Sequence, residues 1–229
     1  MTRKALPEIL YEDNHLIAVN KPGGLLVQGD KTGDKPLIDI LKFYIKEKYK
    51  KPGNVFLGVV HRLDRPTSGV VIMARTSKAL QRMNQLFANR ALSKEYWAII
   101  PKGLKEQELR LEHWLLRKQS KNKSFAYDHE KTNSKKAILK LTQIHQFNRY
   151  SLLSIQLETG RHHQIRCQLA QIGFPIKGDL KYGAPRSNQN GCIDLHARKL
   201  SFIHPVTKEN ISITAPSPKA PLWSDVLSG

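Results

Sequence analysis

The sequence predicts an α+β fold with a mostly antiparallel sheet and few helices. Short apolar runs rich in β-branched residues recur along the chain, and turn residues separate several of them as in hairpins. Few segments show helical spacing, and the helix–strand alternation of a parallel sheet is scarce. No internal repeat or interdomain linker is evident, so we expect one domain over residues 1–229.

The first quarter of the chain predicts a hairpin and then a helix. Residues 8–11 and 15–20 are apolar runs on either side of a turn. The Lys-Pro-Gly-Gly stretch at residues 21–24 breaks the second run, and residues 25–27 resume extended structure. Residues 37–49 carry apolar side chains at helical spacing and lysines on the far face.

The middle of the chain predicts two buried strands, a helix and a third strand. Residues 55–60 and 70–74 are short, β-branched and bounded by turn residues. Residues 94–100 form a further apolar strand. Ser77 is a suitable N-cap for the helix before that strand. This helix has a single apolar face, formed by Leu80, Met83, Leu86 and Phe87.

The last third of the chain predicts a strand, a helix and two closing strands. Residues 150–158 alternate between apolar and polar side chains, as in a strand with one buried face. The chain then turns into a helix that Gly173 ends. Residues 194–204 and 210–214 are expected to be strands, because they are apolar runs with prolines at their ends.

The charge balance indicates a polyanionic partner. The chain has 38 Lys and Arg against 19 Asp and Glu, a net charge of +19 at pH 7. This excess attracts polyanions, so we expect a nucleic acid rather than a membrane surface. No apolar run approaches the roughly 20 residues that span a bilayer, and the N-terminus lacks the apolar core of a signal peptide. The only cysteines, Cys167 and Cys192, imply no disulfide framework, which fits a cytoplasmic protein.

Residues 102–136 are polar and hard to assign. Within them, residues 117–136 hold seven basic side chains against two acidic ones, Asp128 and Glu130. The simplest interpretation is a solvated loop, and the alternative is a mobile loop that grips nucleic acid.

One loop concentrates the groups that could do chemistry. Residues 61–69 read His-Arg-Leu-Asp-Arg-Pro-Thr-Ser-Gly and connect the two predicted buried strands. Pro66 fixes its own φ and pushes the residue before it out of the helical region, so this segment is a loop. Arg62 and Arg65 flank Asp64 and favour its ionised form. Taken alone, such an arrangement is more often a structural Asp–Arg pair than a catalytic site.

The same nine residues resemble the catalytic motif of the RluA-type RNA pseudouridine synthases, His-Arg-Leu-Asp-x-x-Thr-Ser-Gly. The resemblance implies that Asp64 is catalytic, and we expect Arg62 and Arg65 beside it to bind the substrate. It also implies the pseudouridine synthase fold, with a mixed, largely antiparallel sheet and a basic cleft across it. Many members carry an N-terminal S4-like RNA-binding domain. The short stretch before residue 21 leaves no room for one, so we expect a single catalytic domain and a monomer.

Residues 160–166, Gly-Arg-His-His-Gln-Ile-Arg, form a second candidate segment. Taken alone, they favour a phosphate-contacting helix start and a solvated surface about equally, because free N–H groups and the helix dipole attract anions there. The segment resembles the family motif Gly-Arg-x-His-Gln-Ile-Arg, which implies that Arg166 pairs with Asp64. Three residues of the same turn are expected to bind the substrate, namely Arg161, His163 and Gln164.

Further matches extend the resemblance from about residue 8 to about residue 215. Residues 94–96, Lys-Glu-Tyr, are similar to a strand whose tyrosine lies in the family's active site, which implies a catalytic Tyr96. Taken alone, Tyr96 is more simply a core aromatic. Residues 173–183 match the block Gly-x-Pro-Ile-x-Gly-Asp-x-x-Tyr-Gly, in which we expect Asp179 to be structural. Residues 21–25 and 195–207 match the family's first turn and its C-terminal block.

The implied reaction breaks the N1–C1′ bond of uridine, turns the uracil and joins C5 to C1′. It involves no redox change and no net hydrolysis, so we expect no cofactor and no metal. The histidines also lack the spacing of metal ligands. The target base must leave its stack to reach Asp64. We expect a structured RNA, tRNA or ribosomal RNA, as substrate. The alternative is a non-catalytic RNA-binding or ribosome-assembly protein on the same fold.

Overall fold

The computed structural model describes residues 6–30 and 32–224 and groups them into two compact units. The first unit is built from the residues up to Leu92 and from Ala197–Lys219, and the second from Ser93–His196 and the residues from Ala220 on. The first two crossings fall inside the strands β5 (Leu92–Pro101) and β10 (Leu195–Ile203). The sequence shows no linker where the chain passes between the units, because it does so within strands. One domain over the whole chain stays a prediction.

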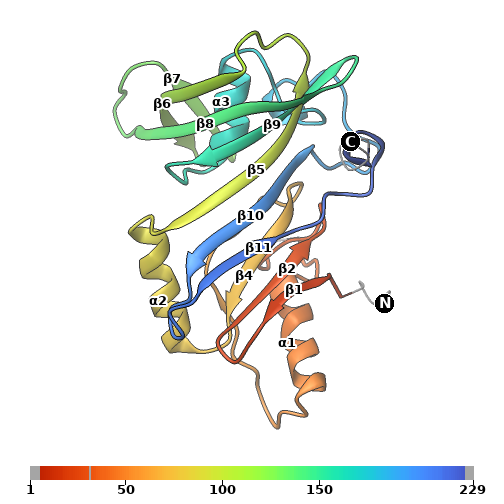
Figure 1. Cartoon of the computed structure of the whole chain (residues 1–229), viewed down its shortest axis with the longest axis vertical. Helices are drawn as coiled ribbons and strands as arrows, with labels where there is room; N and C mark the ends of the chain where they lie inside the picture. The colour runs from red at the N-terminus through yellow and green to blue at the C-terminus, as the bar shows by residue number, and fades with distance from the viewer. Residues whose placement is uncertain (1–5, 31, 225–229) are drawn as a thin grey trace. The chain divides into compact units, whose positions relative to one another are not determined.

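The first unit holds the predicted N-terminal hairpin and its neighbours, in the strand order β1-β2-β4-β10 (Figure 1). The hairpin strands are antiparallel, and β2 is also antiparallel to β4. The strand β11 pairs with β10, and the short β3 pairs with β4. The bounds of the strands not yet given are Ile9–Glu12 for β1, Leu16–Lys21 for β2, Gly58–Val59 for β3, Ser68–Ala74 for β4 and Asn210–Thr214 for β11.

Two helices belong to the first unit, α1 (Leu37–Lys48) and α2 (Ser77–Ala88). The buried side chains of α2, Ala79 and Met83, join the core formed by β2, β4 and β10. The predicted N-cap of α2 was wrong by one residue. Thr76 caps the helix, because its hydroxyl accepts a hydrogen bond from the backbone N–H of Ala79 at 3.1 Å.

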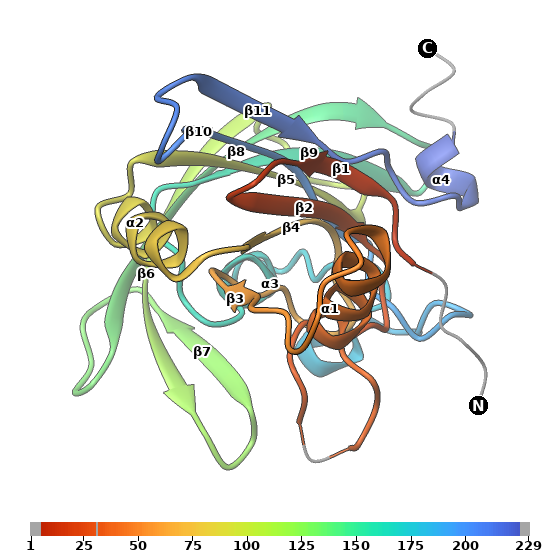
Figure 2. The same cartoon turned by 90° about the horizontal axis from the view of Figure 1, so that it is seen from below.

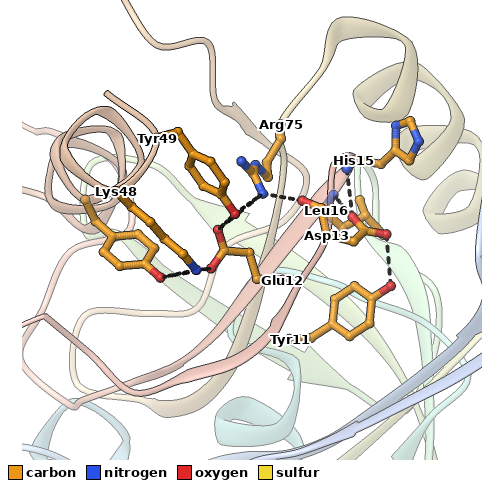
Figure 3. A network of polar contacts seen from close by, with 9 residues as sticks. Tyr11, Glu12, Asp13, His15, Leu16, Lys48, Tyr49 and Arg75 are labelled. Carbon is orange, nitrogen blue, oxygen red and sulfur yellow. Dashed lines mark hydrogen bonds and ion pairs between the residues drawn. The ribbon is translucent and has the colours of Figure 1, made fainter. Parts of the chain in front are cut away.

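A polar network ties α1 to the end of β1 (Figure 3). The Glu12 carboxylate accepts hydrogen bonds from Tyr44 and Tyr49 and from the charged groups of Lys48 and Arg75, at 2.8–3.2 Å. Burial acts to raise the pKa of Glu12, but the hydrogen bonds outweigh it and lower the pKa below its usual value.

The close approach of β4 and β10 depends on Gly69. Its φ is +113°, and a Cβ atom there would lie 2.2–2.7 Å from backbone atoms of Ala197. No side chain fits that space, and the conformation itself favours glycine. The glycine that closes the sequence motif around Asp64 therefore has a packing role.

The second unit is an antiparallel sheet in the order β5-β9-β8-β6-β7, with the helix α3 (Gln164–Gln171) beside it (Figure 1). Ile165 and Leu169 of α3 join the main core of this sheet. Gly173, with a φ of +85°, follows the C-cap Ile172, as predicted. The remaining elements are β6 (Glu108–Lys118), β7 (Lys123–Tyr127), β8 (Lys135–Gln146), β9 (Tyr150–Leu157), the 3-10 turn η1 (Leu180–Tyr182) and α4 (Pro221–Ser224).

Three predicted elements differ from the structure. Residues 117–136 are not one solvated loop, because they include the end of β6, the whole of β7 and the start of β8, joined by exposed turns. The buried face of β7 consists of Ser124 and Ala126, whose small side chains give no strong apolar signal. Residues 25–27 form no strand, since the carbonyls of residues 26 and 27 accept hydrogen bonds from the first turn of α1. Residues 55–60 contribute only the two residues of β3.

Candidate active site

The loop that carries Asp64 is anchored on both sides of that residue. Before it, the His61 ring accepts a hydrogen bond from the backbone N–H of Ile72 at 3.1 Å and stacks on Phe87 with 5.0 Å between centroids. After it, the N–H of Thr67 donates to the Asp64 carbonyl at 3.0 Å, and the Thr67 side chain is buried. Asp64 itself is half-buried. The structure thus presents a carboxylate on a restrained turn.

A buried lysine fixes the backbone of this loop. Lys21, at the end of β2, is fully buried, and its ammonium donates to the carbonyls of Pro22 at 3.0 Å, Leu25 at 2.9 Å and Arg65 at 3.3 Å. The Gly24 N–H also donates to the Arg65 carbonyl, at 2.7 Å. The Lys-Pro-Gly-Gly turn and the Asp64 loop are therefore held together through main-chain carbonyls.

The two arginines beside Asp64 differ in their surroundings. Arg65 forms an ion pair with Asp34 at 2.6 Å and donates to the Gly24 carbonyl at 3.2 Å. These contacts hold its guanidinium against the residue 21–24 turn. Arg62 is exposed. Binding of the substrate by either arginine stays a prediction.

In the second unit, Arg166 lies in the first turn of α3 and is buried. Asp179 accepts two hydrogen bonds from it, from Nε at 2.6 Å and from Nη2 at 2.8 Å. The guanidinium also lies over the Tyr182 ring, 5.1 Å from its centroid. This bidentate geometry fixes both the position and the plane of the guanidinium.

His163 completes the support of Arg166. It precedes α3 with a φ of 54°, a left-handed conformation that is uncommon outside glycine. Its Nε2 lies 3.2 Å from Arg166 Nη1, and its Nδ1 lies 2.9 Å from the Tyr182 hydroxyl oxygen. Because a guanidinium can only donate, Nε2 accepts and the ring proton is on Nδ1. Burial raises the pKa of Tyr182, so its hydroxyl stays protonated.

The two other predicted binding residues of this segment have structural contacts. Gln164 is buried; its Oε1 accepts from the Thr159 hydroxyl at 2.7 Å and the Arg161 N–H at 2.9 Å, and its amide donates to the Ile138 carbonyl at 3.0 Å. Arg161 is half-buried, and its Nε donates to the Lys136 carbonyl at 3.0 Å. These bonds lead the chain into α3, and contacts of either residue with a substrate stay predictions.

Tyr96 lies on β5, opposite Ile155 of β9. It is half-buried and packs against the main core of the second unit. This position explains why a core aromatic was the simpler interpretation from the sequence. A catalytic role for Tyr96 stays a prediction.

Comparison with known proteins identifies the family. The family model described as RNA pseudouridylate synthase matches residues 15–171. This chain belongs to the RNA pseudouridylate synthase family. The tRNA pseudouridine synthase C of Haemophilus influenzae is 34% identical over 229 residues, covering 91% of this chain and 92% of that protein. The ribosomal large subunit pseudouridine synthase C of Buchnera aphidicola (subsp. Baizongia pistaciae) is 34% identical over 217 residues, covering 91% of this chain.

The fold prediction is confirmed by a solved structure. The human RNA pseudouridylate synthase domain containing 4 has a TM-score of 0.78 and 24% sequence identity, over 96% of this chain and 92% of that one. The chain spans about two thirds of the length of several relatives, including 66% of the Buchnera synthase. In the part of the chain that the structure describes, no helix is long and apolar enough to cross a membrane.

Within this synthase-family chain, the structure brings together Arg166 and His163 and adds Asp179 and Tyr182 to them. Asp64 belongs to the other unit, so its pairing with Arg166 stays a prediction. Sequence reasoning missed the roles of Tyr182 and Lys21. Both lie in motif segments that were noticed, residues 173–183 and 21–25, but spacing alone does not tell which side chain turns inward.

Proposed function

We propose that this chain isomerises uridine to pseudouridine in a structured RNA, with Asp64 as the catalytic carboxylate. The observation that carries the proposal is the restrained, half-buried Asp64 on a loop held by the buried Lys21. Family membership supplies the reaction class. A binding protein would have no need of a carboxylate fixed in this way, because an anion repels the phosphates of RNA.

The chemistry requires one ionised carboxylate and no external reactant. Asp64 acts either as a nucleophile towards C1′ or as a group that stabilises and deprotonates the sugar while the base is detached. The N1–C1′ bond breaks, the uracil turns, C5 bonds to C1′, and the proton from C5 moves to N1 through a protein group or water. Water has to be kept from C1′ until the base is recaptured.

Two residues of the second unit would assist Asp64. Arg166 carries a permanent charge in a fixed plane, which suits it to hold a carboxylate ionised and oriented. The Tyr96 ring would stack on the extruded uracil, and its hydroxyl would handle the proton. Arg62, exposed on the same loop as Asp64, would fill the place that the flipped base leaves.

The proposed substrate is tRNA or ribosomal RNA. This follows from the names of the relatives, a tRNA pseudouridine synthase in Haemophilus and a ribosomal large subunit pseudouridine synthase in Buchnera. The +19 charge supplies the attraction to either RNA. Mapping pseudouridines in both RNA classes, from cells with and without the gene, would identify the uridine that depends on it. An unchanged map in both classes would contradict the proposal.

Asp64→Asn should abolish isomerisation and leave RNA binding nearly unchanged, because the amide keeps the size of the side chain but cannot act as an anion. Release of tritium from RNA labelled at uridine C5 measures the turnover. Asp39→Asn is the matched control, since it removes an exposed carboxylate from α1 of the same unit. Wild-type rates in Asp64→Asn would rule out the catalytic role and favour a non-catalytic RNA-binding protein.

Tyr96→Phe should lower turnover about 10²-fold with little change in RNA affinity, since proton transfer by a positioned side chain contributes at least that much and the stacking ring remains. Single-turnover rates and binding isotherms on the same RNA separate the two effects. Tyr96→Leu should weaken binding as well. If Phe turns over at the wild-type rate and only Leu is impaired, the ring alone matters.

A further inference from the structure

One face of the β7–β6–β8 ribbon carries aromatic rings among lysines, and none of these residues is assigned to catalysis. Residues directly opposite one another in antiparallel strands point to the same face. Trp114 of β6 lies opposite both Tyr127 of β7 and Lys136 of β8. The same face continues along the hairpin in steps of two residues. We call it the platform face; its residues are Trp114, Leu116, Lys118, Lys123, Phe125, Tyr127 and Lys136.

The rings of the platform face are turned away from the core of the second unit, whereas Lys123 at its end also lies over the buried Tyr182 ring, 4.9 Å from its centroid. On the opposite face Leu115, Ser124 and Ala126 are buried, and Leu115 and Ala126 pack with Cys167 of α3. Every platform residue is at least partly exposed. In strand order β7 is the outermost strand of this sheet, and Figure 2 shows it paired along one side only, with β6.

Lysine ammonium groups lie over two of the rings. Lys118 and Lys123 approach the Phe125 ring, at 5.9 and 5.5 Å from its centroid. Lys131 lies 5.9 Å from the centroid of Tyr127. A cation over a ring face occupies the place that a stacked base can take, and the displaced ammonium remains close enough to meet the phosphate of that nucleotide.

The charge of this hairpin is uncompensated at one end. Further along the ribbon, Lys136 and Arg110 pair with Glu112, and Lys140 pairs with Glu158. By contrast, no carboxylate among residues 6–30 and 32–224 forms an ion pair with the three lysines that lie over the rings. The aromatic end of the ribbon is therefore also the end with excess positive charge.

We propose that the platform face binds unpaired bases of the RNA substrate, which stack on Phe125, Tyr127 and Trp114 while the lysines contact phosphates. The proposal rests on the proposed function for the identity of the ligand. Rings on alternate residues of a strand stand about 7 Å apart, and sheets bind single-stranded RNA by stacking two or three bases on such rings. A duplex keeps its bases stacked on one another, so the platform face selects single-stranded segments.

The first test separates stacking from charge, with a fluorescent oligouridylate as probe. The double variant Phe125→Leu/Tyr127→Leu should weaken binding at least about fivefold, the lower limit for one stacked base, and leave the salt dependence unchanged. The triple variant Lys118→Gln/Lys123→Gln/Lys131→Gln should flatten the slope of log affinity against log salt by about 2, from roughly 0.7 per phosphate contact. Wild-type affinity in the double variant would overturn the proposal.

A charge-matched control comes from the first unit. Lys46→Gln/Lys50→Gln/Lys51→Gln removes three exposed lysines at and after the end of α1, far in sequence from the platform face. It should keep the wild-type slope. An equal loss in this control would mean that the lysines act through net charge alone, which would overturn a localised site. A duplex probe weakened as much as the oligouridylate by Phe125→Leu/Tyr127→Leu would overturn stacking.

The second test uses the unaltered protein and so does not depend on how the variants fold. An oligouridylate carrying 5-iodouracil should photo-cross-link to β7 or Trp114, with the site mapped by mass spectrometry. Cross-links confined to other elements would overturn the proposal. If tritium release is normal but β7 is not cross-linked, the platform is wrong and the proposed function stands. Cross-linking of β7 without tritium release in any RNA would support the platform and overturn the proposed function.

Discussion

Asp64 and Arg166 are positioned by opposite means. The Asp64 loop is held by its backbone, because the Lys21 ammonium and the Gly24 N–H both donate hydrogen bonds to the Arg65 carbonyl. Restraint of Arg166 acts on the guanidinium itself, through a bidentate carboxylate. A half-buried anion on a fixed turn can change partners during a reaction. A buried cation with a dedicated counter-ion keeps its place, at the cost of making stability depend on that counter-ion.

The largest effect should come from the counter-ion. Asp179→Asn should lower the free energy of unfolding by about 3–5 kcal/mol, because it leaves a buried guanidinium without a full charge partner. Chemical denaturation measures the loss. Glu158→Gln removes a half-buried carboxylate from pairs with the exposed Arg110 and Lys140, and should cost about 0–1 kcal/mol. Equal losses in the two variants would mean that burial of the Arg166 pair carries no special weight.

The next effect concerns the rate. Arg166→Ala should lower turnover of the folded protein by about 10²-fold, the magnitude for a lost preorganised electrostatic contact. Arg161→Ala should have a smaller effect, because that side chain is half-buried and bonded to the Lys136 carbonyl. Tritium release, corrected for the folded fraction, gives both rates. Equal and mild effects would show that the two arginines only hold phosphate.

The smallest effect tests the backbone restraint. Lys21→Met keeps the aliphatic bulk and leaves three carbonyls without their shared donor, so it should cost about 1–3 kcal/mol of unfolding free energy. Turnover should fall as well, while RNA affinity changes little, since the ammonium is fully buried. Lys46→Met, at an exposed site on α1, is the control. If Lys21→Met turns over as fast as the wild type, the clamp has no part in placing Asp64.

Local patterns predicted most of the elements of the first unit, but in the second unit only β5, β9 and α3. The spacing of apolar residues within a short segment was enough to predict three of them. These are the hairpin of β1 and β2, the helix at residues 37–49 and the strand at residues 150–158. The family motifs predicted the reaction class and the fold class; the match to the synthase family bears out the first, and the solved structure bears out the second. The β6–β7 hairpin was missed, because the small residues Ser124 and Ala126 bury a face without an apolar pattern.

The contacts of the candidate site could be predicted only in part. Arg166 was singled out by its motif, but its bidentate partner lies 13 residues further on, in a block where Asp179 was expected to be structural. Lys21 was seen only as part of a strand-breaking turn. Its burial depends on three carbonyls that the turn and the Asp64 loop present together, and such convergence leaves no periodic trace in a sequence.

Gly69 has a consequence for how this gene can vary. Every single-base change in a glycine codon that alters the amino acid introduces a residue with a Cβ atom, and here that atom would lie 2.2–2.7 Å from the backbone of Ala197. Every missense change at position 69 therefore disturbs the packing, although this glycine takes no part in the chemistry. Any substitution of this glycine forces β4 and β10 apart at a point five residues after Asp64.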